Sequence, residues 1–237
     1  MQETSELRTV IESLYEIFAT YPLRADTNAC ACCHSAYDAQ RLHMKPLRKL
    51  NADHLRQYAG DALFVWGEVD DFKHFLPRIF ELEVAHGDSF VDPQAAFGKL
   101  NHGDWWKWPD AEQRSREHFL IVVWGCVLEA EPHEFYGMEI EDWLCGIAQA
   151  ETQLSPYLAK WLAAETENAR LNLAAFIAHT HFAMPNQHPN DYWNDRPELF
   201  DEVAAWVRSE AVKVKMSKIA AEYPQYDFVE TAYISLP

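Results

Sequence analysis

The stretch A-L-F-V-W-G-E-V-D-D-F-K-H-F-L-P-R-I-F-E-L-E-V, from Ala62 to Val84, is the densest apolar and aromatic sequence of the chain. Its large apolar residues recur mostly three and four positions apart, which places them on shared faces of a helix. A helix this apolar must be buried against neighbours on more than one side, so we expect the rest of the chain to wrap around it. We expect a helix from about 51 to 66, a bend at Gly67 and a kink or restart at Pro77, which cannot donate a backbone hydrogen bond.

Outside this stretch the same periodicity predicts further helices, over about 4–20, 35–44, 93–100, 109–131, 139–151 and 155–182, the last with room for a break near Glu165. One long or two shorter helices to about 223 and a tail follow. The segment 183–197 holds three prolines and shows no periodicity, so we expect a loop there. No segment shows the sustained period-two alternation of a strand. The sequence therefore predicts an all-α fold, an irregular multi-helix arrangement forming a single domain over 1–237.

Two similar segments leave a second architecture open. F-V-W-G-E-V occupies 64–69 and V-V-W-G-C-V occupies 122–127. A solenoid of helical hairpins would repeat such a segment from unit to unit. The residues that follow the two copies do not match, so we prefer the irregular domain and keep a short α-helical solenoid as the alternative.

Composition limits the classes of partner. The formal net charge is −17 at pH 7, and both a nucleic-acid backbone and an anionic membrane repel an acidic surface. The N-terminal M-Q-E-T-S-E-L carries acids where a signal peptide carries bases. The longest apolar run, 119–128, is about half of the roughly 20 residues that a membrane span needs. We expect a soluble, cytoplasmic protein that binds neither nucleic acid nor membranes.

The clearest chemical signal is C-A-C-C-H at 30–34. Cys30 and Cys33 have the C-x-x-C spacing that lets two thiolates bind one tetrahedral zinc ion. Cys32 and His34 are nearby further ligands, although no second C-x-x-C or H-x-x-x-H pair follows downstream. The same residues leave two other interpretations open. A helix that begins just after Cys33 would favour its thiolate and hence redox chemistry, or the cysteines are free thiols in a loop.

A second candidate polar site lies in the middle of the aromatic stretch, at Asp70, Asp71 and His74. Asp71 and His74 are three residues apart and share a helix face, as metal ligands do in di-iron carboxylate bundles. The chain holds about as many such pairs as chance supplies, so a capping aspartate and a hydrogen-bonded histidine explain the pattern better.

Four tryptophans form a candidate binding surface. Trp105, Trp106 and Trp108 lie together in the connector before the long helix 109–131, and Trp193 lies in the loop 183–197. Exposed aromatic rings would suit a peptide or a small ligand. Tryptophans that bridge two helices inside a core give the same sequence pattern, and we prefer that interpretation for the connector.

The region from Cys30 to Glu81 resembles a group of uncharacterised bacterial proteins. In that group a C-x-C-C cluster and a K-P-L segment, here 45–47, precede a W-G-x-V-D-D-F-x-H-F-L-P-R signature, here 66–78. The resemblance implies a family and brings no activity with it. It also implies that the cysteine cluster and the helix carrying Asp71 and His74 belong to one unit.

No G-x-S-x-G, P-loop, G-x-G-x-x-G or H-E-x-x-H motif is present. Three hypotheses follow. The first is an interaction or scaffold module whose partner is another protein, the second a zinc-binding protein, and the third a thiol-redox enzyme or sensor that uses Cys30 and Cys33. The sequence leaves open whether the protein is an enzyme and which oligomeric state it adopts.

Overall fold

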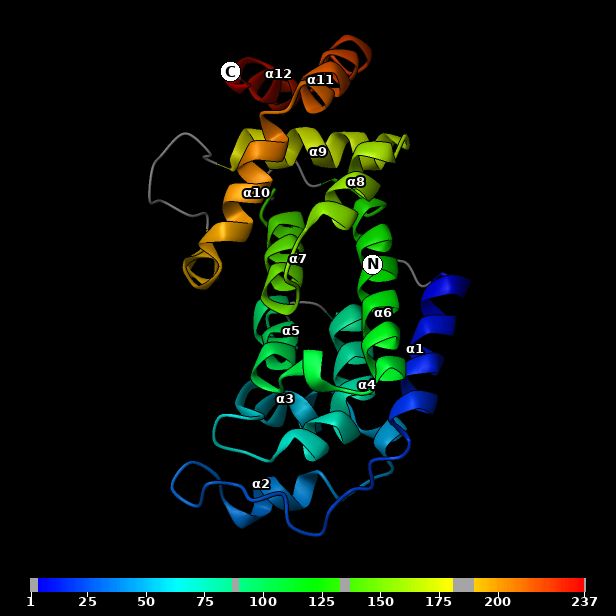
Figure 1. Cartoon of the computed structure of the whole chain (residues 1–237), viewed down its shortest axis with the longest axis vertical. Helices are drawn as coiled ribbons and strands as arrows, with labels where there is room; N and C mark the ends of the chain where they lie inside the picture. Colours follow the sequence, from blue (N-terminus) through cyan, green and yellow to red (C-terminus); the bar gives the residue numbers. More distant parts are fainter. Residues whose placement is uncertain (1–3, 87–89, 133–136, 181–189, 237) are drawn as a thin grey trace. The chain divides into compact units, whose positions relative to one another are not determined.

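The structure, a computed structural model, describes residues 4–86, 90–132, 137–180 and 190–236 (Figure 1). The described residues form twelve α-helices, which are α1 (Ser5–Phe18), α2 (Ala36–Arg41), α3 (Ala52–Asp61), α4 (Val69–His86), α5 (Pro93–His102), α6 (Asp110–Leu128), α7 (Gly137–Ala150), α8 (Ser155–Ala163), α9 (Glu167–His179), α10 (Pro197–Val207), α11 (Glu210–Glu222) and α12 (Asp227–Ser235). Three 3-10 helices accompany them, η1 (Leu47–Lys49), η3 (Trp105–Lys107) and η4 (Asp191–Asp195). No strand occurs in the described ranges, so the prediction of an all-α fold is confirmed.

The chain groups into two compact units, one over 3–123 and the other over 124–237. The boundary between them falls inside α6. A single domain over 1–237 stays a prediction.

Helix α4 is the centre of the first unit. It packs against α1, α3, α5 and η1 (Figure 1). Phe72, Phe75 and Leu76 are fully buried, and the Phe80 ring stacks 5.0 Å from the Phe119 ring. Burying each such side chain contributes about 1.5–3 kcal/mol. The aromatic stretch is therefore surrounded on several sides, as its sequence predicts.

The chain leaves the helical conformation between α3 and α4, where the prediction of a helix to 66 is wrong. Helix α3 ends at Asp61, and Leu63 and Gly67 adopt left-handed φ angles of 66° and 77°. The Leu63 N–H donates to the Trp66 carbonyl at 3.0 Å, which closes a tight turn. The turn directs the Trp66 side chain inward, where its indole donates to Thr27 at 2.8 Å. Burial of this large ring offsets the roughly 1–3 kcal/mol that a left-handed non-glycine residue costs.

Pro77 does not restart α4, which runs without interruption from Val69 to His86. Proline removes one hydrogen bond of the helical ladder. The residues around Pro77, among them Leu76 and Ile79, are buried. Packing on both sides of the proline thus holds the two halves in one helix.

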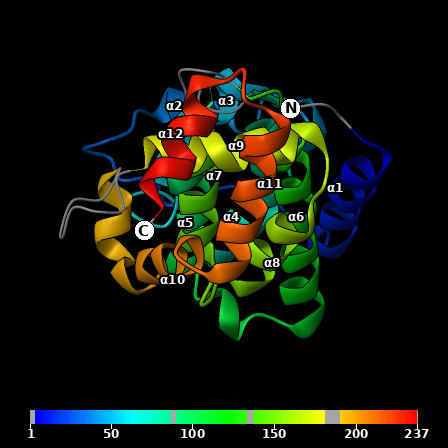
Figure 2. The same cartoon turned by 90° about the horizontal axis from the view of Figure 1, so that it is seen from above.

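Helix α9 is the centre of the second unit and packs against α7, α11 and α12. Seen from above, α12 lies across α9 (Figure 2). The Trp161 ring of α8 is surrounded by the rings of Trp124, Phe176 and Trp206 at centroid distances of 5.2, 5.2 and 5.5 Å. Large aromatic rings therefore join α6, α8, α9 and α10 in one core.

The C-terminal tail is helical, which the sequence analysis did not predict. Helix α12 buries Val229 and Ala232. Its sequence D-F-V-E-T-A-Y-I-S has several β-branched residues and modest helix propensity. Contact with α9 and α11 is what stabilises it.

The two V-W-G segments do not form a structural repeat. Trp66 lies in the turn after α3, whereas Trp124 lies inside α6. The local evidence for a solenoid is therefore removed. No helix in the described ranges is both long and apolar enough to cross a membrane.

Candidate metal centre

Three cysteine sulfurs converge in the loop before α2. The Sγ atoms of Cys30, Cys32 and Cys33 all lie within 4.8 Å of one another. The distance is 2.8 Å between Cys30 and Cys32 and 3.6 Å between Cys32 and Cys33. All three are free thiols, with Cys32 and Cys33 exposed and Cys30 half-buried. In the described part of the chain this is the one group of three or more Cys, His, Asp or Glu ligands close enough to hold an ion.

Backbone hydrogen bonds explain why the sulfurs meet. The Cys30 carbonyl accepts from the N–H groups of Cys33 at 3.0 Å and His34 at 2.9 Å, which folds the four residues into a turn. The Cys30 N–H donates to the Val65 carbonyl at 2.9 Å, so the turn between α3 and α4 anchors the loop. Ser35 then caps α2 by accepting from the Asp38 N–H. The cluster and α4, which carries Asp71, both lie in the first unit.

His34, a predicted ligand, lies outside the group of three sulfurs. Its side chain is buried, and its Nδ1 lies 3.1 Å from the Gln57 amide nitrogen. The ring packs 4.3 Å from the Trp66 ring, and Nε2 lies 3.6 Å from an Asp61 carboxylate oxygen. These contacts make His34 the residue that fixes the end of the cysteine loop on the first unit.

The thiols differ in acidity. A hydrogen bond from the Cys32 thiol lowers the pKa of Cys30, and the same hydrogen bond raises the pKa of Cys32 to about 11. Cys30 is therefore the first of the pair to become a thiolate, which is both the nucleophilic and the metal-binding form of cysteine.

The sulfur positions fit a thiolate-bound ion after a small adjustment. Zinc–sulfur bonds of about 2.3 Å place the sulfurs of a tetrahedral site about 3.8 Å apart. The Cys32–Cys33 distance of 3.6 Å already matches. The Cys30–Cys32 distance of 2.8 Å must widen by about 1 Å.

Asp71 has a structural role in the first unit. Its buried carboxylate accepts from both the Nε, at 2.7 Å, and an Nη atom of Arg24. It also accepts from the Glu68 N–H at 2.9 Å and thus caps α4. Asp70 is exposed. The carboxylate of Asp71 is therefore already saturated with donors from the protein.

His74 has a different partner. Its Nδ1 lies 2.8 Å from the Tyr21 carbonyl oxygen, and burial lowers the pKa of the imidazole. The ring packs edge-on against Phe75 at 4.7 Å. Asp71 and His74 each hold the segment 21–24 on α4, and they do not join the cysteine cluster.

The connector tryptophans divide between surface and interior. Trp108 is buried and packs edge-on against Phe18 at 5.9 Å. Trp105 is half-buried under the Arg116 guanidinium, at 3.7 Å from the ring centre. Trp106 is 49% exposed. Of these three rings, Trp106 is the one that is exposed enough to serve as an aromatic contact surface. The burial of Trp108 agrees with the interpretation that a connector tryptophan bridges helices inside the core.

Trp193 is not an exposed contact, so its assignment to a binding surface is wrong. It is 1% exposed, and its indole N–H donates to the Glu141 carboxylate. The rest of the predicted loop falls partly outside the described residues, because 181–189 are not described. The described part, η4, lies against α7 and α10.

The sequence analysis did not single out Glu141. Its carboxylate is buried in the second unit and accepts from the Asn190 amide at 2.9 Å on each oxygen, besides the Trp193 indole. Burial raises the pKa of Glu141 to about 7. The partners lie 49 and 52 positions away in the sequence, so no local sequence pattern reveals this group.

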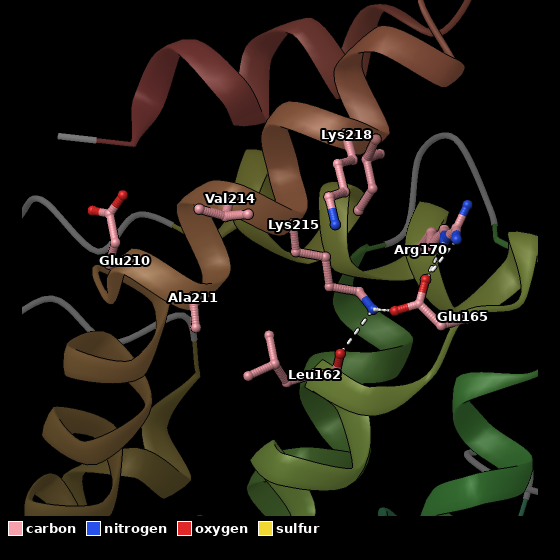
Figure 3. A pocket seen from close by; sticks show the side chains of 9 residues that line it. Leu162, Glu165, Arg170, Glu210, Ala211, Val214, Lys215 and Lys218 are labelled. Carbon is pink, nitrogen blue, oxygen red and sulfur yellow. Dashed lines mark hydrogen bonds and ion pairs between the residues drawn. The ribbon is translucent and has the colours of Figure 1, made fainter.

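The second unit also contains a cavity of about 380 Å³ between α8, α9 and α11 (Figure 3). The buried Lys215 ammonium donates to the carbonyls of Leu162, at 2.8 Å, and Ala164, at 2.5 Å, and to Glu165 at 3.1 Å. Arg170 pairs with Glu165 at 2.5 Å. The lysine therefore stabilises the C-terminus of α8, and its three donors are used within the protein.

Comparison of the chain with protein-family models, with curated proteins and with solved structures gave no match in any of the three. The resemblance to the group with the C-x-C-C cluster stays a prediction. The chemistry of the described residues is what can support a function.

Proposed function

We propose that the protein binds one zinc ion through the thiolates of Cys30, Cys32 and Cys33. The observation that carries this proposal is the convergence of the three Sγ atoms within 4.8 Å of one another. Sequence spacing alone favours the pair Cys30 and Cys33, and the turn adds Cys32 as a third donor.

The donor set determines the class of ion. Thiolates are soft ligands that select zinc, monovalent copper and iron–sulfur clusters over magnesium and calcium. Ligation requires deprotonated sulfur, so each thiol that binds releases its proton. The lowered pKa of Cys30 favours this sulfur as the first ligand. A bound cation then favours the thiolate forms of Cys32 and Cys33 as well.

Elemental analysis of protein purified without chelator or affinity metal tests the proposal. We expect about one zinc per chain in the wild type, since one group of three thiolates holds one ion. Cys30→Ser, Cys32→Ser and Cys33→Ser should each lower the zinc content strongly. Cys126→Ser, which changes a half-buried cysteine of the second unit, is the matched control and should retain the metal. Zinc content that stays the same in all four variants would refute the site.

A second candidate function is a thiol redox switch, favoured by the 2.8 Å separation of the Cys30 and Cys32 sulfurs. Here a peroxide is the oxidant. The Cys30 thiolate attacks one peroxide oxygen, the O–O bond breaks, and hydroxide leaves as a sulfenic acid forms. The Cys32 sulfur then attacks the Cys30 sulfur, a disulfide forms, and the hydroxyl leaves as water with the Cys32 proton. The sequence hypothesis paired Cys30 with Cys33, whereas this geometry favours Cys32.

Mass spectrometry of the apoprotein after mild peroxide distinguishes this candidate. A Cys30–Cys32 disulfide lowers the mass of the peptide by about 2 Da, since two thiol hydrogens are lost. Zinc should suppress the reaction, because bound thiolates are less available. An unmodified peptide would exclude the redox function and leave zinc binding unaffected.

The scaffold hypothesis, a protein partner and the cytoplasmic compartment stay predictions. They rest on the acidic, helix-rich sequence and its lack of enzyme motifs. The three converging sulfurs give metal binding the more specific support.

A further inference from the structure

The cysteine loop supplies one ligand fewer than a closed zinc site needs. Structural zinc sites use four protein ligands, whereas sites that react keep one position for an exogenous ligand. Among the described residues, three sulfurs form the group and no fourth Cys, His, Asp or Glu joins it.

The polar side chains next to the cluster are engaged elsewhere. Asp38 accepts from the Ser35 N–H at 2.8 Å and from the Ser35 hydroxyl at 2.7 Å. Asp26 accepts from the Asn28 N–H at 2.8 Å. His34 lies between Gln57 and the Trp66 ring. Each of these side chains contributes a contact that orders the loop.

Main-chain hydrogen bonds hold the loop. Cys30 bonds to Val65, Cys33 and His34 through main-chain groups only. Cys32 and Cys33 are exposed, so an ion bound to them faces solvent. A site of this kind can lose its ion without unfolding its surroundings, unlike a zinc finger, in which metal binding drives folding.

Building on the proposed zinc site, we infer that its fourth coordination position is open to solvent and accepts a thiol from a second molecule. Zinc held by three thiolates is a soft centre, and a further sulfur ligand matches it. The entering thiol forms a zinc–sulfur bond, the zinc–water bond breaks, and the thiol proton passes to solvent. Stepwise repetition of this exchange transfers the ion to a thiol-rich acceptor.

The charge of the site determines which thiols bind most tightly at the fourth coordination position. One divalent ion and three thiolates carry a net charge of −1, and the chain carries −17. An incoming thiol on a cationic molecule is attracted, and one on an anionic molecule is repelled. The acceptor is therefore expected to present its thiols in neutral or basic surroundings.

Cobalt(II) bound to the full chain provides the test, because its thiolate charge-transfer absorption reports the number of sulfur ligands. Cysteamine, 2-mercaptoethanol and mercaptoacetate serve as cationic, neutral and anionic probes. We expect saturable growth of the charge-transfer band by about one third, from three thiolates to four. The half-saturating concentration should rise from cysteamine to mercaptoacetate, and added salt should narrow the difference.

The outcomes distinguish failure of the open fourth position from failure of the zinc site itself. Three-thiolate absorption that no thiol changes would overturn the inference and leave the zinc site intact. No cobalt–thiolate absorption at all would overturn both.

Discussion

At the scale of the residue, the buried groups of this protein are explained by the partners they find. Asp71 meets Arg24 and a backbone N–H, and Lys73 forms an ion pair with Glu112 at 2.7 Å. Glu141 differs, because within the described ranges its carboxylate accepts hydrogen bonds from Asn190 and Trp193 and forms no ion pair. Desolvation then outweighs the hydrogen bonds, and the pKa of Glu141 rises from 4.5 to about 7.

This raised pKa predicts a pH dependence of stability. Between the ordinary value of 4.5 and about 7 the folded protein keeps the Glu141 proton while the unfolded chain loses it. The free energy of unfolding therefore falls as pH rises through this window, by on the order of 3 kcal/mol in total. Urea unfolding at pH 5 and pH 8 should show a smaller decrease in Glu141→Gln than in the wild type. An equal decrease in both proteins would refute the assignment of this pH dependence to Glu141.

At the scale of the element, helix starts follow from local sequence and the exceptions follow from packing. Thr4, Ser35 and Asn51 cap their helices through a contact that is local in sequence, because a capping side chain bonds amides only two or three residues away. The turn at Leu63 was missed, because leucine favours helix and only burial of Trp66 justifies its positive φ. Helix α12 was missed for a similar reason, since its stability comes from α9.

The C-terminus of α8 provides a prediction at this scale. Lys215→Met leaves the carbonyls of Leu162 and Ala164 without the donor they have in the wild type. We expect the free energy of unfolding to fall by about 1–3 kcal/mol, the usual cost of buried polar groups that lose their partner. Lys218→Met, on the same helix but exposed, is the matched control and should change it by less than about 0.5 kcal/mol. Equal effects of the two substitutions would contradict the capping role.

At the scale of the whole molecule, the fold and the candidate site depend on different parts of the sequence. Apolar periodicity over long segments predicted the all-α class. The cysteine cluster was visible because its donors lie within four positions, 30–33. The exclusion of His34 from the sulfur group and the role of Glu141 were not visible, since they depend on contacts with Gln57, Trp66 and Asn190. Contacts distant in sequence are what local patterns cannot report.

The position of the metal centre on an exposed loop predicts that the fold does not require zinc. The cores around α4 and α9 contain none of the three ligands. Removing the ion with a chelator should leave the helical circular dichroism unchanged. The melting temperature should fall only by the amount by which zinc binding stabilises the native state. Loss of helix on chelation would show that the metal is part of the fold and would contradict a preformed loop.

The central claim is that three thiolates of one loop hold the ion, and X-ray absorption spectroscopy of the zinc-loaded protein tests it most directly. A three-thiolate centre with an open fourth position predicts three sulfur ligands at about 2.3 Å and one lighter oxygen or nitrogen ligand at about 2.0–2.2 Å. Cys32→Ser should reduce the sulfur count by one. A zinc shell with only oxygen and nitrogen ligands, or an unchanged sulfur count in Cys32→Ser, would contradict the proposed centre.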